Sequence, residues 1–86
     1  MNAEDYLPDL EELAVEMGMR IRYEKGDFDG GYCILKDQQI IVVNKKLHPS
    51  RKASVIAVAL GGMGIENLFV KPNVRMFIED EMVRAR

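Results

Sequence analysis

The chain has 86 residues, which is the size of one small domain, and we expect a single domain over residues 1–86. Hydrophobic residues make up 48% and charged residues 30% of it, which is too apolar for a disordered chain and too charged for a membrane segment. The net charge of -2 gives no general attraction to nucleic acid. The first residues are polar and acidic rather than a basic-then-apolar leader, so we expect a cytoplasmic protein.

The first half of the chain predicts a helix followed by a strand. Apolar side chains recur at helical spacing from about Tyr6 to Met17, with Asp5 as the expected N-cap. Gly18 can take the left-handed conformation that ends a helix. Residues 19–24 then alternate between apolar and charged side chains, which is typical of a half-buried strand.

The middle of the chain predicts two more strands. Three glycines in residues 25–31 indicate a turn, and strands follow at 32–36 and 39–44, with residues 37–38 as the turn between them. The run 40–43 is apolar at every position, so its strand should be central or covered on both faces. The simplest topology is an antiparallel meander of consecutive strands.

Two helices complete the predicted fold. The first runs from Ser50 to Leu60 with Ser50 or His48 as its cap, and it should end at Gly61-Gly62. The second covers about residues 73–84, with Pro72 at its first position. The sequence therefore predicts an α+β fold: a helix, a three-stranded antiparallel meander, then two helices packed on one face of the sheet.

Cys33 and His48 are the first residues to consider for catalysis or metal binding. Cys33 is the only cysteine, so no intramolecular disulfide is possible, and its mid-strand position favours a buried, inert thiol. His48 precedes Pro49 and is interpreted as a surface or capping residue, because one histidine and one cysteine do not make a zinc spacing. We therefore expect no catalytic residue, no metal site and no cofactor.

A basic cluster surrounds the predicted start of the helix at Ser50. Backbone N–H groups and the helix dipole already favour anions there, and cations in the first turn are unfavourable for an isolated helix. This conflict makes the cluster a candidate site for an anion, a phosphate or an acidic partner, although such a run is usually a solvated face. The cluster consists of Lys45, Lys46, His48, Arg51 and Lys52.

Residues 57–62 read Ala-Val-Ala-Leu-Gly-Gly and follow a strand that ends in Val-Val-Asn. From residue 21 to 62 the layout resembles the zincin-like metallopeptidase domains that cleave phage repressors, whose helix reads Ala-His-Glu-Leu-Gly-His. The two zinc-binding histidines would be Val58 and Gly62, and the general-base glutamate would be Ala59. The resemblance therefore implies the scaffold without the metal or the hydrolysis. The chain also resembles small bacterial proteins with a Gly-Gly-x-Cys hairpin, which imply no activity.

The expected function is a non-catalytic protein-interaction or self-associating module. A three-stranded sheet leaves unpaired edges unless something covers them, which favours a protein partner or a second copy. The alternative is an anion or nucleic-acid binder that uses the basic cluster, although the net charge disfavours nucleic acid. A thiol- or metal-dependent enzyme comes last, and no membrane partner is expected.

Overall fold

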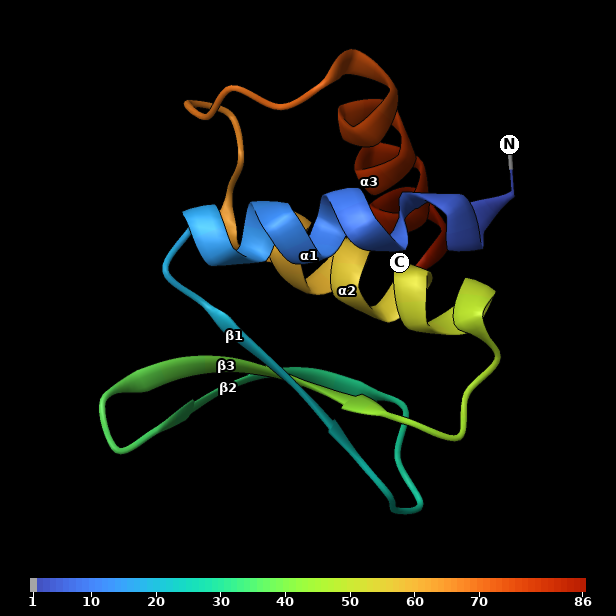
Figure 1. The fold of residues 1–86 in the computed structure, drawn as a ribbon. Helices are drawn as coiled ribbons and strands as arrows, with labels where there is room; N and C mark the ends of the chain where they lie inside the picture. Colours follow the sequence, from blue (N-terminus) through green and yellow to red (C-terminus); the bar gives the residue numbers. More distant parts are fainter. Residues whose placement is uncertain (1) are drawn as a thin grey trace.

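The computed structural model describes residues 2–86, apart from the side chain of Leu35. All three α-helices lie on one side of a three-stranded sheet, and no described helix covers the other face (Figure 1). The predicted α+β class is confirmed. The elements, in chain order, are the 3-10 helix η1 (Ala3–Tyr6), α1 (Leu7–Glu16), β1 (Arg20–Glu24), β2 (Gly30–Leu35), β3 (Gln38–Asn44), α2 (Pro49–Met63) and α3 (Pro72–Arg84).

The strand order is β1-β3-β2, so the predicted meander is wrong. β3 pairs with β1 in parallel and with β2 antiparallel, which makes it the central strand. Its composition explains this place, because Ile40, Ile41 and Val43 are at most 2% exposed and apolar side chains of this kind need neighbours on both sides. The expectation that the apolar strand is central is confirmed.

Residues 25–29 carry the chain from β1 across the end of β3 to β2, and Asn44 fixes this crossing. Asn44 is only 8% exposed. Its side-chain Nδ2 donates hydrogen bonds to the carbonyl oxygens of Gly26 at 2.9 Å and Phe28 at 2.8 Å. The backbone N–H of Asn44 donates to the carbonyl of Asp29 at 3.0 Å. One amide therefore satisfies two loop carbonyls and holds β2 on the far side of β3.

The turn between β2 and β3 consists of Lys36 and Asp37, one residue earlier than predicted. Both residues have positive φ, 49° and 66°, as a tight two-residue hairpin turn requires. Moving such a turn by one residue shifts the strand register by two, which leaves every side chain on the same face. The apolar alternation therefore could not distinguish the two registers.

α1 begins through η1 rather than at the predicted N-cap. Asp5 lies inside η1, where its Oδ2 accepts from the backbone N–H of Asn2 at 2.9 Å, so the expectation that Asp5 is the cap is wrong. The carboxyl-terminal end of α1 agrees better with the prediction, because the helix ends at Glu16 and Gly18 has a φ of 77°. The pattern of apolar residues located the helix, but it did not locate the first turn.

The core lies between the sheet and α1 and α2, and α3 packs against α2 rather than against the sheet. The predicted last helix is confirmed, with Val74 and Ile78 buried and Phe77 and Met82 partly buried. The most deeply buried members of the core come from four elements. They are Leu10, Ala14, Ile41, Val43, Ala53, Ile56, Ala57, Leu60 and Ile78.

α2 continues past its predicted end, with Gly61 and Gly62 inside the helix and Gly64 as its C-cap. A Cβ added to Gly61 would collide with Sδ of Met82 and lie 2.9 Å from Cγ2 of Ile78, both on α3. Gly61 is therefore a contact point between two helices, and this packing keeps a residue of low helix propensity inside α2.

Alanine substitutions at Gly61 and Gly62 should change stability in opposite directions. A Cβ added at Gly62 meets no atom within 4 Å. Gly62→Ala should therefore stabilise the protein by roughly 0.5–1 kcal/mol, because alanine has the higher helix propensity. Gly61→Ala should destabilise it by about 1–2 kcal/mol, because Met82 and Ile78 must move. Urea denaturation of both variants measures the difference, and equal midpoints would contradict the packing role of Gly61.

Candidate interaction site at the edge of the sheet

β2 is an edge strand with β3 on one side and no described strand on the other. In a hairpin with a two-residue turn, the pair that flanks the turn is hydrogen bonded and the pattern alternates from there. That pair is Leu35 with Gln38, so Gly31 and Cys33 also bond to β3. Tyr32 and Ile34 therefore direct their backbone N–H and C=O groups outward, which is where another strand would bind.

The side chains of β2 are also exposed. Tyr32 is 42% and Ile34 is 65% exposed, and they lie on the face of the sheet that carries the helices, because Tyr32 pairs with the core residue Ile41. Cys33 is exposed on the opposite face. The expectation of a buried thiol is therefore wrong, since an edge strand on a face without helices leaves Cys33 open to solvent.

A hollow of about 480 Å³ lies beside the outer edge of β2. Tyr32 of β2 forms one wall of this hollow. Residues of α2 form its floor, and their small or flexible side chains leave the hollow unfilled. We call it the β2 hollow. Its five lining residues are Tyr32, Val58, Ala59, Gly62 and Met63.

The three positions at which the zincin-like resemblance expects metal ligands and a general base all line the β2 hollow. Here they are Val58, Ala59 and Gly62, which offer only apolar surface and space. The sequence identifies these positions only as places where the metal ligands and the base are missing, and it did not predict that β2 would form the opposite wall. The side chains present suit an apolar group in the hollow rather than a metal.

The β2 hollow continues toward the end of α3 into a polar region. There Glu81, 8% exposed, accepts a hydrogen bond through Oε1 from Ser54 Oγ at 2.5 Å, and its Oε2 lies 3.6 Å from Nη1 of Arg84. Arg51 forms an ion pair with Asp29, Nη2 to Oδ2, at 2.8 Å. These charges are paired within the chain, so the groups beside β2 that remain without a partner in the chain are mainly apolar side chains and strand backbone.

Two members of the predicted basic cluster are bound to the crossing loop and to β1. Arg51 makes the ion pair with Asp29, and Lys52 Nζ lies 5.6 Å from the centre of the Tyr23 ring, within the range of a cation–π contact. Tyr23 donates its hydroxyl to Oε2 of Glu11 at 2.8 Å, and burial together with this carboxylate raises the pKa of Tyr23. These contacts join α1, β1 and α2.

The other members of the cluster lie around the start of α2. His48 is the N-cap, and its Nδ1 accepts from the backbone N–H of Ser50 at 3.1 Å, so the capping interpretation of His48 is confirmed. Lys45 and Lys46 are exposed in the connection between β3 and α2. Of the four cations of the cluster, two are thus exposed without a described partner, whereas Arg51 and Lys52 are engaged within the chain.

The face of the sheet opposite the helices is polar. As the alternation predicted, Arg20 and Arg22 lie on this face, beside Ile40 and Val42 of β3. Arg22 pairs with Glu24 at 3.3 Å, Nη2 to Oε1. Ile40 is nevertheless only 2% exposed, so the longer polar side chains around it exclude water from Ile40.

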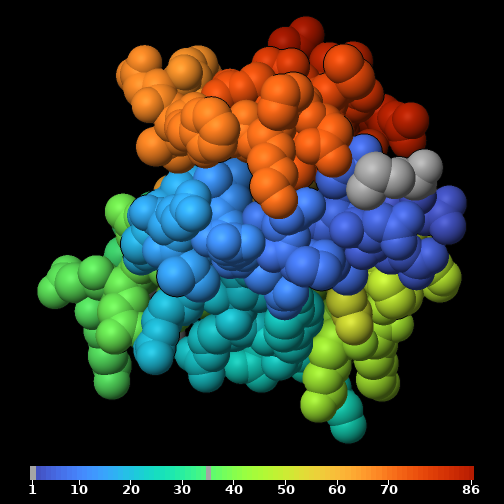
Figure 2. Space-filling model, turned by 45° about the horizontal axis from the view of Figure 1, so that its top comes forward, coloured from blue at the N-terminus to red at the C-terminus, as the bar shows by residue number. Residues whose placement is uncertain are grey.

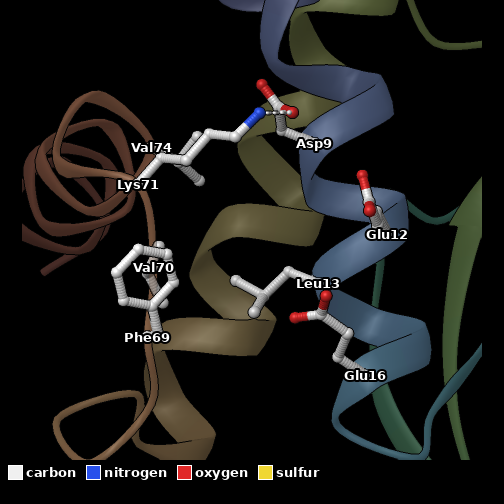
Figure 3. A pocket seen from close by; sticks show the side chains of 8 residues that line it. All are labelled: Asp9, Glu12, Leu13, Glu16, Phe69, Val70, Lys71 and Val74. Carbon is white, nitrogen blue, oxygen red and sulfur yellow. Dashed lines mark hydrogen bonds and ion pairs between the residues drawn. The ribbon is translucent and has the colours of Figure 1, made fainter.

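A second, smaller hollow of about 120 Å³ lies between α1 and the segment before α3. Figure 2 shows this segment, in orange, against α1, in blue. In Figure 3 the ring of Phe69, 92% exposed, stands opposite the acidic side chains of α1, and Lys71 Nζ reaches Oδ1 of Asp9 at 3.2 Å. This hollow has room for about one side chain and adjoins no strand edge.

Within residues 2–86, no three His, Cys, Asp or Glu side chains gather closely enough to hold a metal ion. Among the described helices, none has both the length and the apolar character needed to cross a membrane. Comparison of the chain with protein-family models, with curated protein sequences and with solved structures gives no match.

Proposed function

We propose that the protein is a non-catalytic interaction module that binds an extended polypeptide segment along β2. The observation that carries this proposal is an edge strand with outward N–H and C=O groups directly beside an apolar hollow. Addition of a strand to such an edge supplies backbone hydrogen bonds, and a neighbouring hollow selects a side chain of the added segment.

The sequence of β2 supports this proposal. Natural edge strands are usually protected by charged residues, proline or bulges, which prevent pairing with other chains. From Gly30 to Leu35, β2 contains no charged residue and no proline. The exposed apolar side chains of Tyr32 and Ile34 lie on the same face as the β2 hollow, so one added strand could contact both.

The zincin-like resemblance is compatible with this reading. It would make the protein a scaffold whose former metal positions, Val58, Ala59 and Gly62, now form an apolar floor. The alternative, an anion or nucleic-acid binder at the basic cluster, has weaker support because Arg51 and Lys52 are engaged with Asp29 and Tyr23. It stays a prediction, as does the absence of catalysis.

Selection of binding peptides from a displayed library tests the proposed function. Peptides that bind should shift the backbone amide signals of Tyr32 and Ile34 in the NMR spectrum of labelled protein. Ile34→Lys places a charge on the edge and should lower their affinity about tenfold or more, since each factor of ten corresponds to ~1.4 kcal/mol.

Val15→Lys is the matched control, because Val15 is 72% exposed on α1 and lies outside both strand and hollow. It should leave the affinity unchanged. The proposed function is contradicted if every selected peptide binds Ile34→Lys as tightly as the unsubstituted protein, or if the shifts fall on the hollow beside α1.

A further inference from the structure

We infer that the segment bound along β2 is β2 of a second copy, paired antiparallel across a twofold axis that passes beside Cys33. This inference rests on the proposed function and names its partner. The two three-stranded sheets would join into one sheet of six strands, with the helices of both copies on the same side.

The hydrogen-bond pattern restricts the register. Tyr32 and Ile34 have the outward N–H and C=O groups, so these residues must meet in the hydrogen-bonded pairs of the new ladder. Centring the axis on Cys33 places Tyr32 of each copy opposite Ile34 of the other, twice. This register pairs an aromatic with a β-branched side chain on both sides of the axis, which is a favourable cross-strand combination.

The β2 hollow suits this occupant. In the Cys33-centred register, Ile34 of the second copy lies next to Tyr32, on the helix-bearing face and one strand further out. That position is beside the floor formed by Val58, Ala59 and Met63. By symmetry each copy inserts one isoleucine and offers one hollow, so the same surface is complementary to itself.

The charges that flank β2 are complementary in this arrangement. Asp29 precedes the strand and Lys36 follows it, and the positions between them are uncharged. Antiparallel pairing brings Lys36 of one copy opposite Gly30 of the other, at both ends of the ladder. Lys36 then lies next to Asp29, whose exposed carboxylate is also bound by Arg51 of its own copy. A parallel pairing would instead place like charges together.

The predicted size of the interface sets the expected affinity. A stable dimer generally buries about 800 Å² on each partner, whereas one strand and one inserted side chain bury less. The total accessible surface of one copy is 5647 Å². We therefore expect a reversible dimer that forms at high protein concentration and dissociates on dilution, rather than a permanent one.

Cys33 gives a direct test of the register. On the axis, the two Cys33 residues form a non-hydrogen-bonded pair with Cα atoms about 4.5 Å apart, which is within the range that a disulfide spans. Oxidised glutathione should therefore join the two thiols into one disulfide. The two Cys33 thiols together lose two electrons and two protons, and oxidised glutathione takes up both as its own disulfide is reduced to two glutathione thiols. The covalent dimer should form much faster than by random collision.

The collision control is the double variant Cys33→Ser/Val15→Cys, which carries its one thiol at an exposed position on α1. We expect at least a tenfold slower cross-link from it than from the unsubstituted protein. Ile34→Lys, which keeps Cys33, should slow the cross-link to the control rate. In sedimentation without oxidant, Cys33→Ser should remain a dimer and Ile34→Lys should be a monomer.

Each other outcome overturns the inference. A monomeric reduced protein, or a dimer that Ile34→Lys leaves intact, excludes β2 as the interface between copies. A dimer that Ile34→Lys dissociates, but whose Cys33 cross-links no faster than the control, excludes this register. If the protein is monomeric but peptides still bind to β2, the proposed function stands and a second copy is excluded as the partner.

Discussion

Asn44→Asp is expected to destabilise the protein by about 3 kcal/mol at pH 7. The amide Nδ2 donates to the carbonyl oxygens of Gly26 and Phe28 in a residue that is 8% exposed. A carboxylate has no hydrogen to donate, so the substitution leaves two carbonyls without their donor and turns a negative charge toward them. The loss is large for a domain of this size, whose total stability is on the order of 5–10 kcal/mol.

The effect of Asn44→Asp should depend on pH in a defined direction. Burial and the facing carbonyls would raise the folded-state pKa of the introduced carboxyl above its unfolded value of about 3.9. The protonated form can donate one hydrogen bond, so the variant should be closest to the parent below about pH 4 and should lose stability as the pH rises above it.

Urea denaturation at pH 4 and pH 7 measures both effects. Asn67→Asp is the matched control, because Asn67 is exposed in the turn before α3. The substitution there makes the same change of charge at a site that is not buried. A loss of less than 1 kcal/mol for Asn44→Asp at pH 7 would show that the crossing of residues 25–29 does not depend on this amide.

Gly30→Ala is expected to cost about 3 kcal/mol or more, whereas Gly31→Ala should be neutral or slightly stabilising. Gly30 has a φ of 137°, and a Cβ there would collide with the carbonyl oxygen of Val42 and lie 3.0 Å from Cα of Val43. These are backbone atoms of the central strand, so only a shift of the ladder relieves the contact. Gly31 meets no atom within 4 Å.

The neighbouring glycines therefore form their own matched pair. Thermal or urea unfolding of the two variants should differ by about 3 kcal/mol. Amide I infrared or far-ultraviolet circular dichroism spectra can verify that Gly31→Ala keeps the sheet. Equal stability of the two variants would mean that the close approach of Gly30 to β3 is not required for the fold.

The local elements were predictable because their patterns are local. The alternation in residues 19–24 and the helical spacing of Val74, Phe77, Ile78 and Met82 each depend on which face of one element is buried. The strand order was not predictable in this way. The crossing loop that sets it is held by two hydrogen bonds from the Asn44 side chain, and these leave no periodic signal in the sequence.

The candidate site was only partly accessible from sequence. The sequence favoured an interaction module with open strand edges, but it did not identify which strand would be at the edge beside a hollow. Cys33 was expected to be buried because cysteines usually are, whereas its exposure follows from the position of β2 in the sheet. The β2 hollow combines Tyr32 with residues of α2 that lie far away in the chain.

The parallel pairing of β1 with β3 has a consequence for the order of folding. The hairpin of β2 and β3 is contiguous and can close through its two-residue turn within microseconds. β1 can join only after the chain has looped across the end of β3, which is a less local and slower step. Until β1 docks, the apolar central strand has a second open edge, and this transient species is the one most exposed to aggregation during synthesis.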